Sequence, residues 1–117
     1  MASPVRVAGA AQYAAGAAGA AVTVTVSAPP GGQSLFLDGY ETSVTAAAVT
    51  DATNVVLNEG SNVLSAKAFP AAAAIGEQRG TIFATPLGPF DGAATLVIGA
   101  PGGSTVMKGF IYYHYRQ

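Results

Sequence analysis

The stretch "GFIYYHYRQ", residues 109–117, carries four aromatic residues within nine positions at the end of the sequence. Successive side chains of a β-strand point to opposite faces of its sheet. As a strand, this stretch would place Phe110, Tyr112 and His114 on one face, and Ile111, Tyr113 and Tyr115 on the other. Both faces would be large and mainly apolar. We therefore expect one face to pack in the core and the other to be covered by a neighbouring subunit or another protein surface.

Working outward from this stretch, the rest of the chain also has β-character. "VTVTVS" (22–27) alternates cleanly, with valines on one face and hydroxyl residues on the other. Further strands are expected at 34–44, 53–58, 62–69, 81–86, 93–100 and 105–115, with an irregularity at Gly39. Residues 59–61 indicate a tight hairpin, and residues 70–80 a longer loop with room for one helical turn. Seven or eight short strands without a convincing helix predict a single antiparallel β-sandwich, jelly-roll-like, over residues 22–117.

The N-terminal region differs from this pattern. Residues 8–21, "AGAAQYAAGAAGAA", are rich in Ala and Gly, and three glycines disfavour a helix by about 1 kcal/mol each. A short helix and a flexible leader are both open interpretations. We favour an extended N-terminal arm, residues 1–21, that lies against another surface, because small side chains allow close backbone approach.

The composition is unusual in its low charge. Five Lys and Arg and six Asp and Glu make 9% of the 117 residues, against about 25% in a typical soluble domain. Ala (25) and Gly (15) together supply a third of the chain, so large core residues are few. A small domain with an uncharged polar surface would explain the low charge. We favour the alternative that neighbouring subunits cover much of the surface.

Several classes of function are disfavoured by what the sequence lacks. There is no Cys, which excludes disulfides and thiolate metal sites. We find no signal peptide and no apolar run long enough to span a membrane, so we expect no membrane partner. The few basic residues are scattered, so we expect no nucleic-acid partner.

No pattern indicates catalysis or a cofactor. His114 is the single histidine and lies in no nucleophile pattern, so we expect a structural or interface role, with pH-sensitive assembly if it is buried at a contact. The segment "GAPGGST" (99–105) lacks the Lys of a phosphate-binding loop and indicates a hairpin turn. The carboxylates show no calcium-loop spacing and are interpreted as solubilising charges in turns or at strand ends; they are Asp38, Glu41, Asp51, Glu59, Glu77 and Asp91.

The aromatic residues divide into two groups. Most of one group are expected in the core, since all fall on or beside expected strands: Phe36, Tyr40, Phe69, Phe83 and Phe90. The other group supplies candidates for a protein interface, because tyrosine combines apolar area with a hydroxyl that tolerates partial burial. These candidate interface residues are Tyr13, Phe110, Tyr112, Tyr113, His114 and Tyr115.

Four segments together resemble the small jelly-roll virion proteins of tailed bacteriophages. They are "SLFLDGYETSVTAAA", "NVVLNEGSNVLSAKAFPAAAA", "TIFATPLGPFDGAATLVIGAPGGS" and "GFIYYHYR", within residues 34–116. The resemblance implies a sandwich that forms trimers, an N-terminal arm along the capsid, and no catalytic residues. A second likeness competes with it: "VVLNEGSNVLSAKAF" is similar to a segment of bacterial immunoglobulin-like domains, although "PAAAAIGEQRG" replaces the turn usual there. Both likenesses are β-sandwiches and differ in strand order.

We therefore expect a non-enzymatic structural virion protein without a cofactor, a capsid decoration (cement) subunit that stabilises the shell through protein contacts. Its expected partners are copies of itself, with a trimer favoured, and the major capsid protein or other virion subunits. It would assemble into the virion in the host cytoplasm. The alternatives are a receptor- or glycan-binding module of a phage tail or fibre, and a small hydrolase with carboxylates gathered in a cleft.

Overall fold

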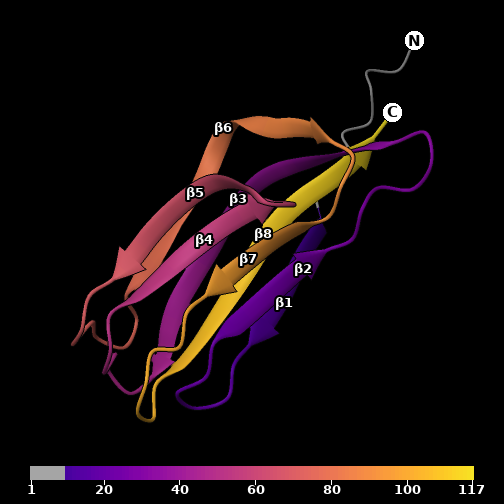
Figure 1. The fold of residues 1–117 in the computed structure, drawn as a ribbon. Helices are drawn as coiled ribbons and strands as arrows, with labels where there is room; N and C mark the ends of the chain where they lie inside the picture. The colour runs from indigo at the N-terminus through magenta and orange to yellow at the C-terminus, as the bar shows by residue number, and fades with distance from the viewer. Residues whose placement is uncertain (1–9) are drawn as a thin grey trace.

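The computed structural model describes residues 10–117, and within this range the chain is all-β (Figure 1). The first nine residues of the expected arm lie outside the described residues. The strands are β1 Ala10–Ala15, β2 Val22–Val26, β3 Ser34–Ala46, β4 Thr53–Glu59, β5 Asn62–Phe69, β6 Gln78–Phe90, β7 Ala94–Ile98 and β8 Val106–Arg116.

The strands form two antiparallel four-stranded sheets, with the orders β1-β8-β3-β6 and β2-β7-β4-β5. The chain changes sheet at every connection except the β4–β5 hairpin, which turns at Gly60 with a φ of 57°. This order is that of a jelly roll, whereas immunoglobulin-like sandwiches keep more consecutive strands as neighbours in one sheet. The expected β-sandwich is confirmed, and the strand order is the jelly-roll alternative of the two likenesses.

The core lies between the two sheets and follows the alternation that the sequence predicts. In β2 the three valines are buried and the two threonines exposed. In β7, Ala94, Leu96 and Ile98 are buried in the same way. Burial of these inward side chains, at about 25 cal/mol per Å² of apolar area, is the main force that holds the sheets together.

A bulge at Gly39 reverses the facing of side chains along β3. The pairing of β3 with both neighbours shifts register between Leu37 and Gly39. Leu35 and Leu37 are buried before the shift, and Tyr40 is buried after it. Because of this phase change, the inward positions are odd-numbered in the first part of β3 and even-numbered in the second.

Two elements differ from the expected boundaries. Residues 10–15 of the expected arm are extended, and they pair with β8 as the edge strand β1. Strand β6 covers residues 78–90, so it begins inside the expected 70–80 loop and continues beyond residue 86. It passes Pro86 and Pro89 because it lies at a sheet edge, where a strand tolerates a missing backbone donor.

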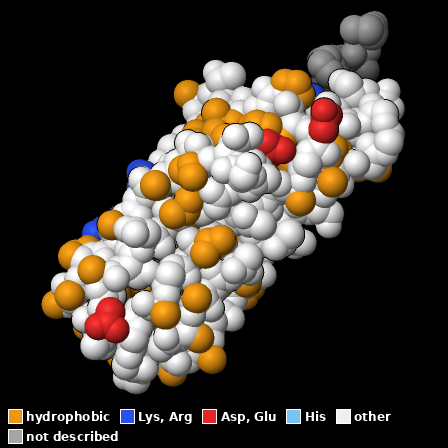
Figure 2. All heavy atoms as spheres, viewed as in Figure 1, with side chains coloured by type: hydrophobic (Ala, Val, Ile, Leu, Met, Phe, Trp, Pro, Cys, Tyr) orange, Lys and Arg blue, Asp and Glu red, His pale blue; other side chains and the backbone are white. Residues whose placement is uncertain are grey.

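The surface is poor in charge, as the composition requires. Figure 2 shows a face with scattered hydrophobic side chains and few charged ones. The outward positions of the β2-β7-β4-β5 sheet are mainly small or polar, and include Thr23, Thr25, Asn54 and Thr95. Residues 10–117 contain no helix long and apolar enough to cross a membrane.

Candidate functional site

Strand β8 presents its two aromatic faces to different surroundings. Ile111 is fully buried, and Tyr113 and Tyr115 pack against the core from the same face. The Tyr115 hydroxyl donates to the Ser27 carbonyl, with an O–O distance of 2.8 Å. Burial, followed by the neighbouring Tyr113, raises the pKa of the Tyr115 phenol above its usual value. This face of β8 is therefore covered by the opposite sheet of the same molecule.

The other face of β8 points outward and is only partly covered. It forms the centre of a surface that we call the aromatic face, which consists of Tyr13, Phe36, Ile82, Phe110, Tyr112 and His114 on the outside of the β1-β8-β3-β6 sheet. Tyr13 is 54% exposed and Ile82 67% exposed. These exposed fractions are large for side chains with so much apolar area. Within residues 10–117, no neighbouring side chain covers Tyr13 or Ile82 completely.

The rings of the aromatic face stack on one another. The Tyr13 and Phe110 centroids are 4.7 Å apart, and Phe110 lies parallel to Tyr112 at 6.1 Å. Pairs at such distances contribute about 0.5–1.5 kcal/mol each beyond the burial of their area. The row therefore runs from the edge strand β1 onto the neighbouring strand β8 as one continuous contact.

At the far end of β8 a second ring cluster extends the aromatic face onto β3. The Phe36 ring is stacked on the His114 ring at 5.3 Å, and the Arg116 guanidinium lies 3.8 Å from the Phe36 centroid. The Nδ1 atom of His114 lies 2.9 Å from Oδ2 of Asp38. His114 is thus fixed by an acid on one side and an aromatic ring on the other, which agrees with the structural role expected for it.

Glu41 connects β3 to the centre of the aromatic face. The Tyr112 hydroxyl donates to Oε2 of Glu41 over 3.3 Å. Partial burial raises the pKa of the Tyr112 phenol, and the Glu41 carboxylate raises it further by charge repulsion and by accepting the hydrogen bond. Tyr112 therefore stays neutral to a higher pH than a free tyrosine.

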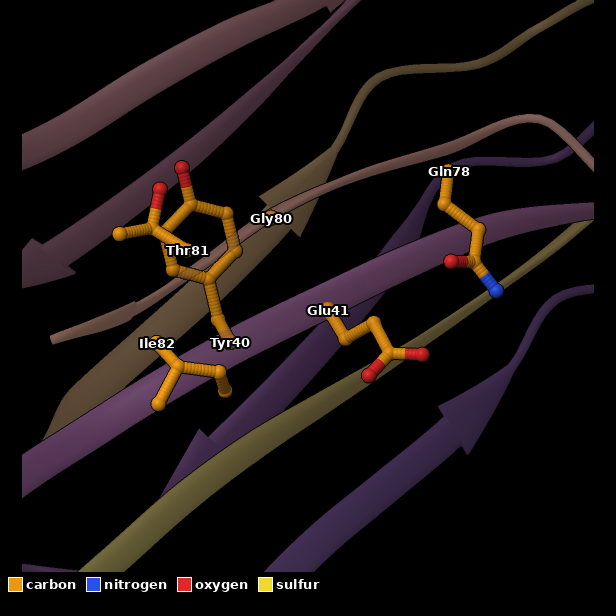
Figure 3. A pocket seen from close by; sticks show the side chains of 6 residues that line it. All are labelled: Tyr40, Glu41, Gln78, Gly80, Thr81 and Ile82. Carbon is orange, nitrogen blue, oxygen red and sulfur yellow. The ribbon is translucent and has the colours of Figure 1, made fainter.

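A hollow of about 300 Å³ lies beside this pair, between β3 and β6. Its lining residues are Tyr40, Glu41, Gln78, Gly80, Thr81 and Ile82. Figure 3 shows the side chains of Glu41, Gln78 and Ile82 on one side of the strands and the ring of Tyr40 on the other. Gly80 pairs with Glu41 and carries no side chain, and the hollow is a shallow depression in the outer surface of the sheet.

The structure brings together four of the six candidate interface residues. Tyr13, Phe110, Tyr112 and His114 lie on the aromatic face, whereas Tyr113 and Tyr115 turn inward. Tyr40 and Phe69 are fully buried, and Phe83 and Phe90 pack against the core, as expected of the core group. Phe36 of that group instead lies on the outer face, because the Gly39 bulge reverses the facing of β3.

The interpretation of every acid as a loop or strand-end charge is wrong for Asp38 and Glu41. Both lie within β3, and each contacts a ring of β8 on the aromatic face. The sequence did contain a signal: both acids flank the Gly39 irregularity, where a bulge turns side chains to the outer face. Among residues 10–117, no cluster of three or more metal-ligating side chains is found.

No protein-family model matches the chain, and no curated protein matches it.

Proposed function

We propose that this chain is a non-enzymatic structural subunit of a bacteriophage particle, a capsid decoration protein that docks on the shell through its aromatic face. The observation that carries the proposal is the contrast between the two outer surfaces of the sandwich. One displays the exposed ring of Tyr13 beside the half-buried rings of Phe110 and Tyr112, and the other displays threonine, asparagine, valine and alanine side chains but no aromatic ring from residues 10–117. Aromatic enrichment is characteristic of the centre of protein interfaces.

The size of the aromatic face supports a protein partner. Four strands spaced about 4.8 Å apart span about 19 Å, and the eleven residues of β8 at about 3.4 Å each span about 37 Å. The projected area is then about 700 Å², and the relief of the side chains increases the accessible area. A stable protein contact buries about 800 Å² on each partner, so this one face is large enough for such a contact.

The charges on the face also suit a neutral protein surface. Two acids, Asp38 and Glu41, are balanced by Lys108 and Arg116 on the outward side of β8. A balanced face gains little from long-range attraction and depends on close packing. Such a face would resist removal chiefly through the area that it buries, repeated at many equivalent positions of a shell.

The stacking of the rings favours a protein over a glycan. Sugars bind to the open face of an aromatic ring, but Phe36 is stacked on His114 and covered by Arg116. Phe110 contacts rings on both β1 and β8. A glycan titration that perturbs the Tyr112 ring resonance at millimolar concentration would contradict the proposal and favour the receptor-binding alternative.

The direct test is binding to empty shells of the phage whose genome encodes the chain. A Phe110→Ser and Tyr112→Ser double variant should lose at least about tenfold in affinity in a cosedimentation assay, since central interface aromatics typically contribute more than about 1 kcal/mol each. The matched control carries Val56→Ser and Val97→Ser on the outer surface of the other sheet and should bind like the wild-type chain. Equal binding by both variants, or a gene that lies outside any virion gene cluster, would refute the proposal.

A further inference from the structure

The four sheet edges are not equally protected against pairing with another chain. At the β5–β6 side, the Lys67 ammonium donates to the Gly80 carbonyl over 2.9 Å and the Arg79 guanidinium donates to the Ala68 carbonyl over 2.8 Å. Strand β6 also contains two prolines. Charged side chains and prolines are the usual devices that prevent edge-to-edge association.

Strand β1 has none of these devices. Its sequence, AAQYAA, contains no charge and no proline, and its register with β8 is unbroken from Ala10 to Ala15. It is the outermost strand of its sheet, and no other strand of residues 10–117 pairs with its free edge. An uncharged, regular edge of this kind is a template for another strand.

The register identifies which backbone groups of β1 point to the free edge. The Gly16 amide donates to the Met107 carbonyl over 3.0 Å, which continues the β1–β8 ladder by one position. Hydrogen-bonded and non-bonded positions alternate along an antiparallel pair. Even-numbered residues of β1 therefore bond to β8, and the amides and carbonyls of Ala11, Tyr13 and Ala15 point outward.

We propose that two copies of this chain pair through β1, antiparallel, about a two-fold axis that is perpendicular to the sheet and passes beside Tyr13. The free groups belong to odd-numbered residues, and the same residues carry the outward-facing side chains, Tyr13 among them. Setting Tyr13 opposite Tyr13 of the second copy pairs Ala11 with Ala15 on both sides. All three free positions are then bonded, in about six hydrogen bonds.

Other registers satisfy fewer groups. A shift by one residue would place outward side chains opposite inward ones, which breaks the continuity of the face. A shift by two leaves one of the three free positions without a partner inside β1. The symmetric register also sets two tyrosine rings across the axis, and aromatic cross-strand pairs of this kind stabilise a sheet. The row from Phe110 to Tyr13 then continues into the second copy.

The pairing has a consequence that rests on the proposed function. An axis perpendicular to the sheet keeps both aromatic faces on the same side of the dimer, so both could dock on one shell at once and gain avidity. The bacteriophage resemblance implied a trimer, whereas self-pairing of one edge is two-fold by symmetry. The mass of the free protein therefore separates the two assemblies.

Light scattering and sedimentation velocity on the full chain, without shells, test the pairing. We expect twice the monomer mass of 11.5 kDa at high micromolar concentration. Ala11→Pro removes an outward-facing donor and leaves the bonds to β8 in place, because an edge strand tolerates proline there. It should weaken the dimer at least tenfold, whereas the control Ala11→Ser keeps the backbone donor and should remain dimeric.

Tyr13→Lys is a second variant that changes no backbone group. It sets two lysines directly opposite each other, with their Cα atoms about 5.5 Å apart across the axis, so that like charges repel, and it should also give the monomer mass. A wild-type chain of monomer or trimer mass, or a dimer that neither variant weakens, would overturn the pairing. These masses are independent of shell binding. A monomeric wild-type chain therefore leaves the docking proposal intact, and a dimeric wild-type chain that does not bind shells contradicts docking alone.

Discussion

Substitutions at two neighbouring residues of β8 should have different effects on the stability of the sandwich, because the two side chains lie on opposite faces of the strand. Ile111 is fully buried between the sheets, whereas Tyr112 lies on the aromatic face. Ile→Ala removes three carbons from a buried side chain and lowers the free energy of unfolding by about 2–5 kcal/mol, whereas Ile→Val removes one carbon and lowers it by about 0.5–1.5 kcal/mol. Tyr112→Ala loses one ring stack and one long, part-buried hydrogen bond, so we expect a loss of about 1–2 kcal/mol.

Urea unfolding monitored by circular dichroism measures these differences. With a slope of about 1–3 kcal/mol per molar urea, Ile111→Ala should lower the midpoint by about 1–2 M or more, and the Ile111→Val control by a few tenths of a molar. Tyr112→Ala should lower the midpoint by several tenths of a molar, closer to the shift of Ile111→Val than to that of Ile111→Ala. If Tyr112→Ala destabilises the chain as much as Ile111→Ala does, the assignment of the two faces of β8 is wrong and the aromatic face belongs to the core.

Three further outcomes follow from individual contacts. The hydroxyls of Tyr40 and Ser65 are hydrogen-bonded across the sandwich, with an O–O distance of 2.7 Å. Tyr40→Phe should therefore lower the free energy of unfolding by about 1 kcal/mol in the same urea assay. An unchanged free energy of unfolding would contradict this hydrogen bond. Because the pKa of Tyr112 is raised in the folded state, the contribution of this phenol to stability is fully present below its unfolded pKa of 10.0 and is lost as pH rises through the folded value. Glu41→Gln should therefore move the titration of the Tyr112 ring resonance toward 10.0 and reduce that loss, and an unmoved titration would exclude the Glu41 carboxylate as a cause. A Cβ at Gly80 would collide with the Tyr40 carbonyl oxygen and would lie 2.9 Å from the Cα of Glu41. Gly80→Ala should therefore lower the melting temperature by several degrees. An unchanged melting temperature would show that β3 and β6 move apart easily at Gly80.

The β-strands of the middle and end of the chain could be predicted because side-chain alternation is a local property. The valines of 22–27 and the alternation of residues 110–115 are both confirmed. The jelly-roll order could not be derived from these patterns, since strand order depends on which sheet each connection reaches. The sequence motifs supplied only two competing likenesses, and the pairing of β8 between β1 and β3 distinguishes them.

The remaining differences have local physical causes. Residues 10–15 have weak strand propensity, and β1 forms because β8 offers it a partner, which sequence periodicity cannot reveal. The outward position of Phe36 depends on the phase change at Gly39, whose location could be suspected but whose effect on facing could not. The partners of Asp38 and Glu41 lie more than seventy residues away in the chain, so only the pairing of β3 with β8 brings them to the candidate site.

The central claim is that a protein partner covers the aromatic face, and hydroxyl-radical footprinting of shell-bound chain tests it most directly. Tyr13, Phe110 and Tyr112 should lose most of their reactivity on binding. Val63, on β5 of the other sheet, and Ile75, in the β5–β6 connection, are 63% and 61% exposed and provide internal controls. The account predicts protection of the three rings with unchanged labelling of the two controls. Unchanged labelling of the rings on bound chain, with protection at Val63 or Ile75, would contradict it.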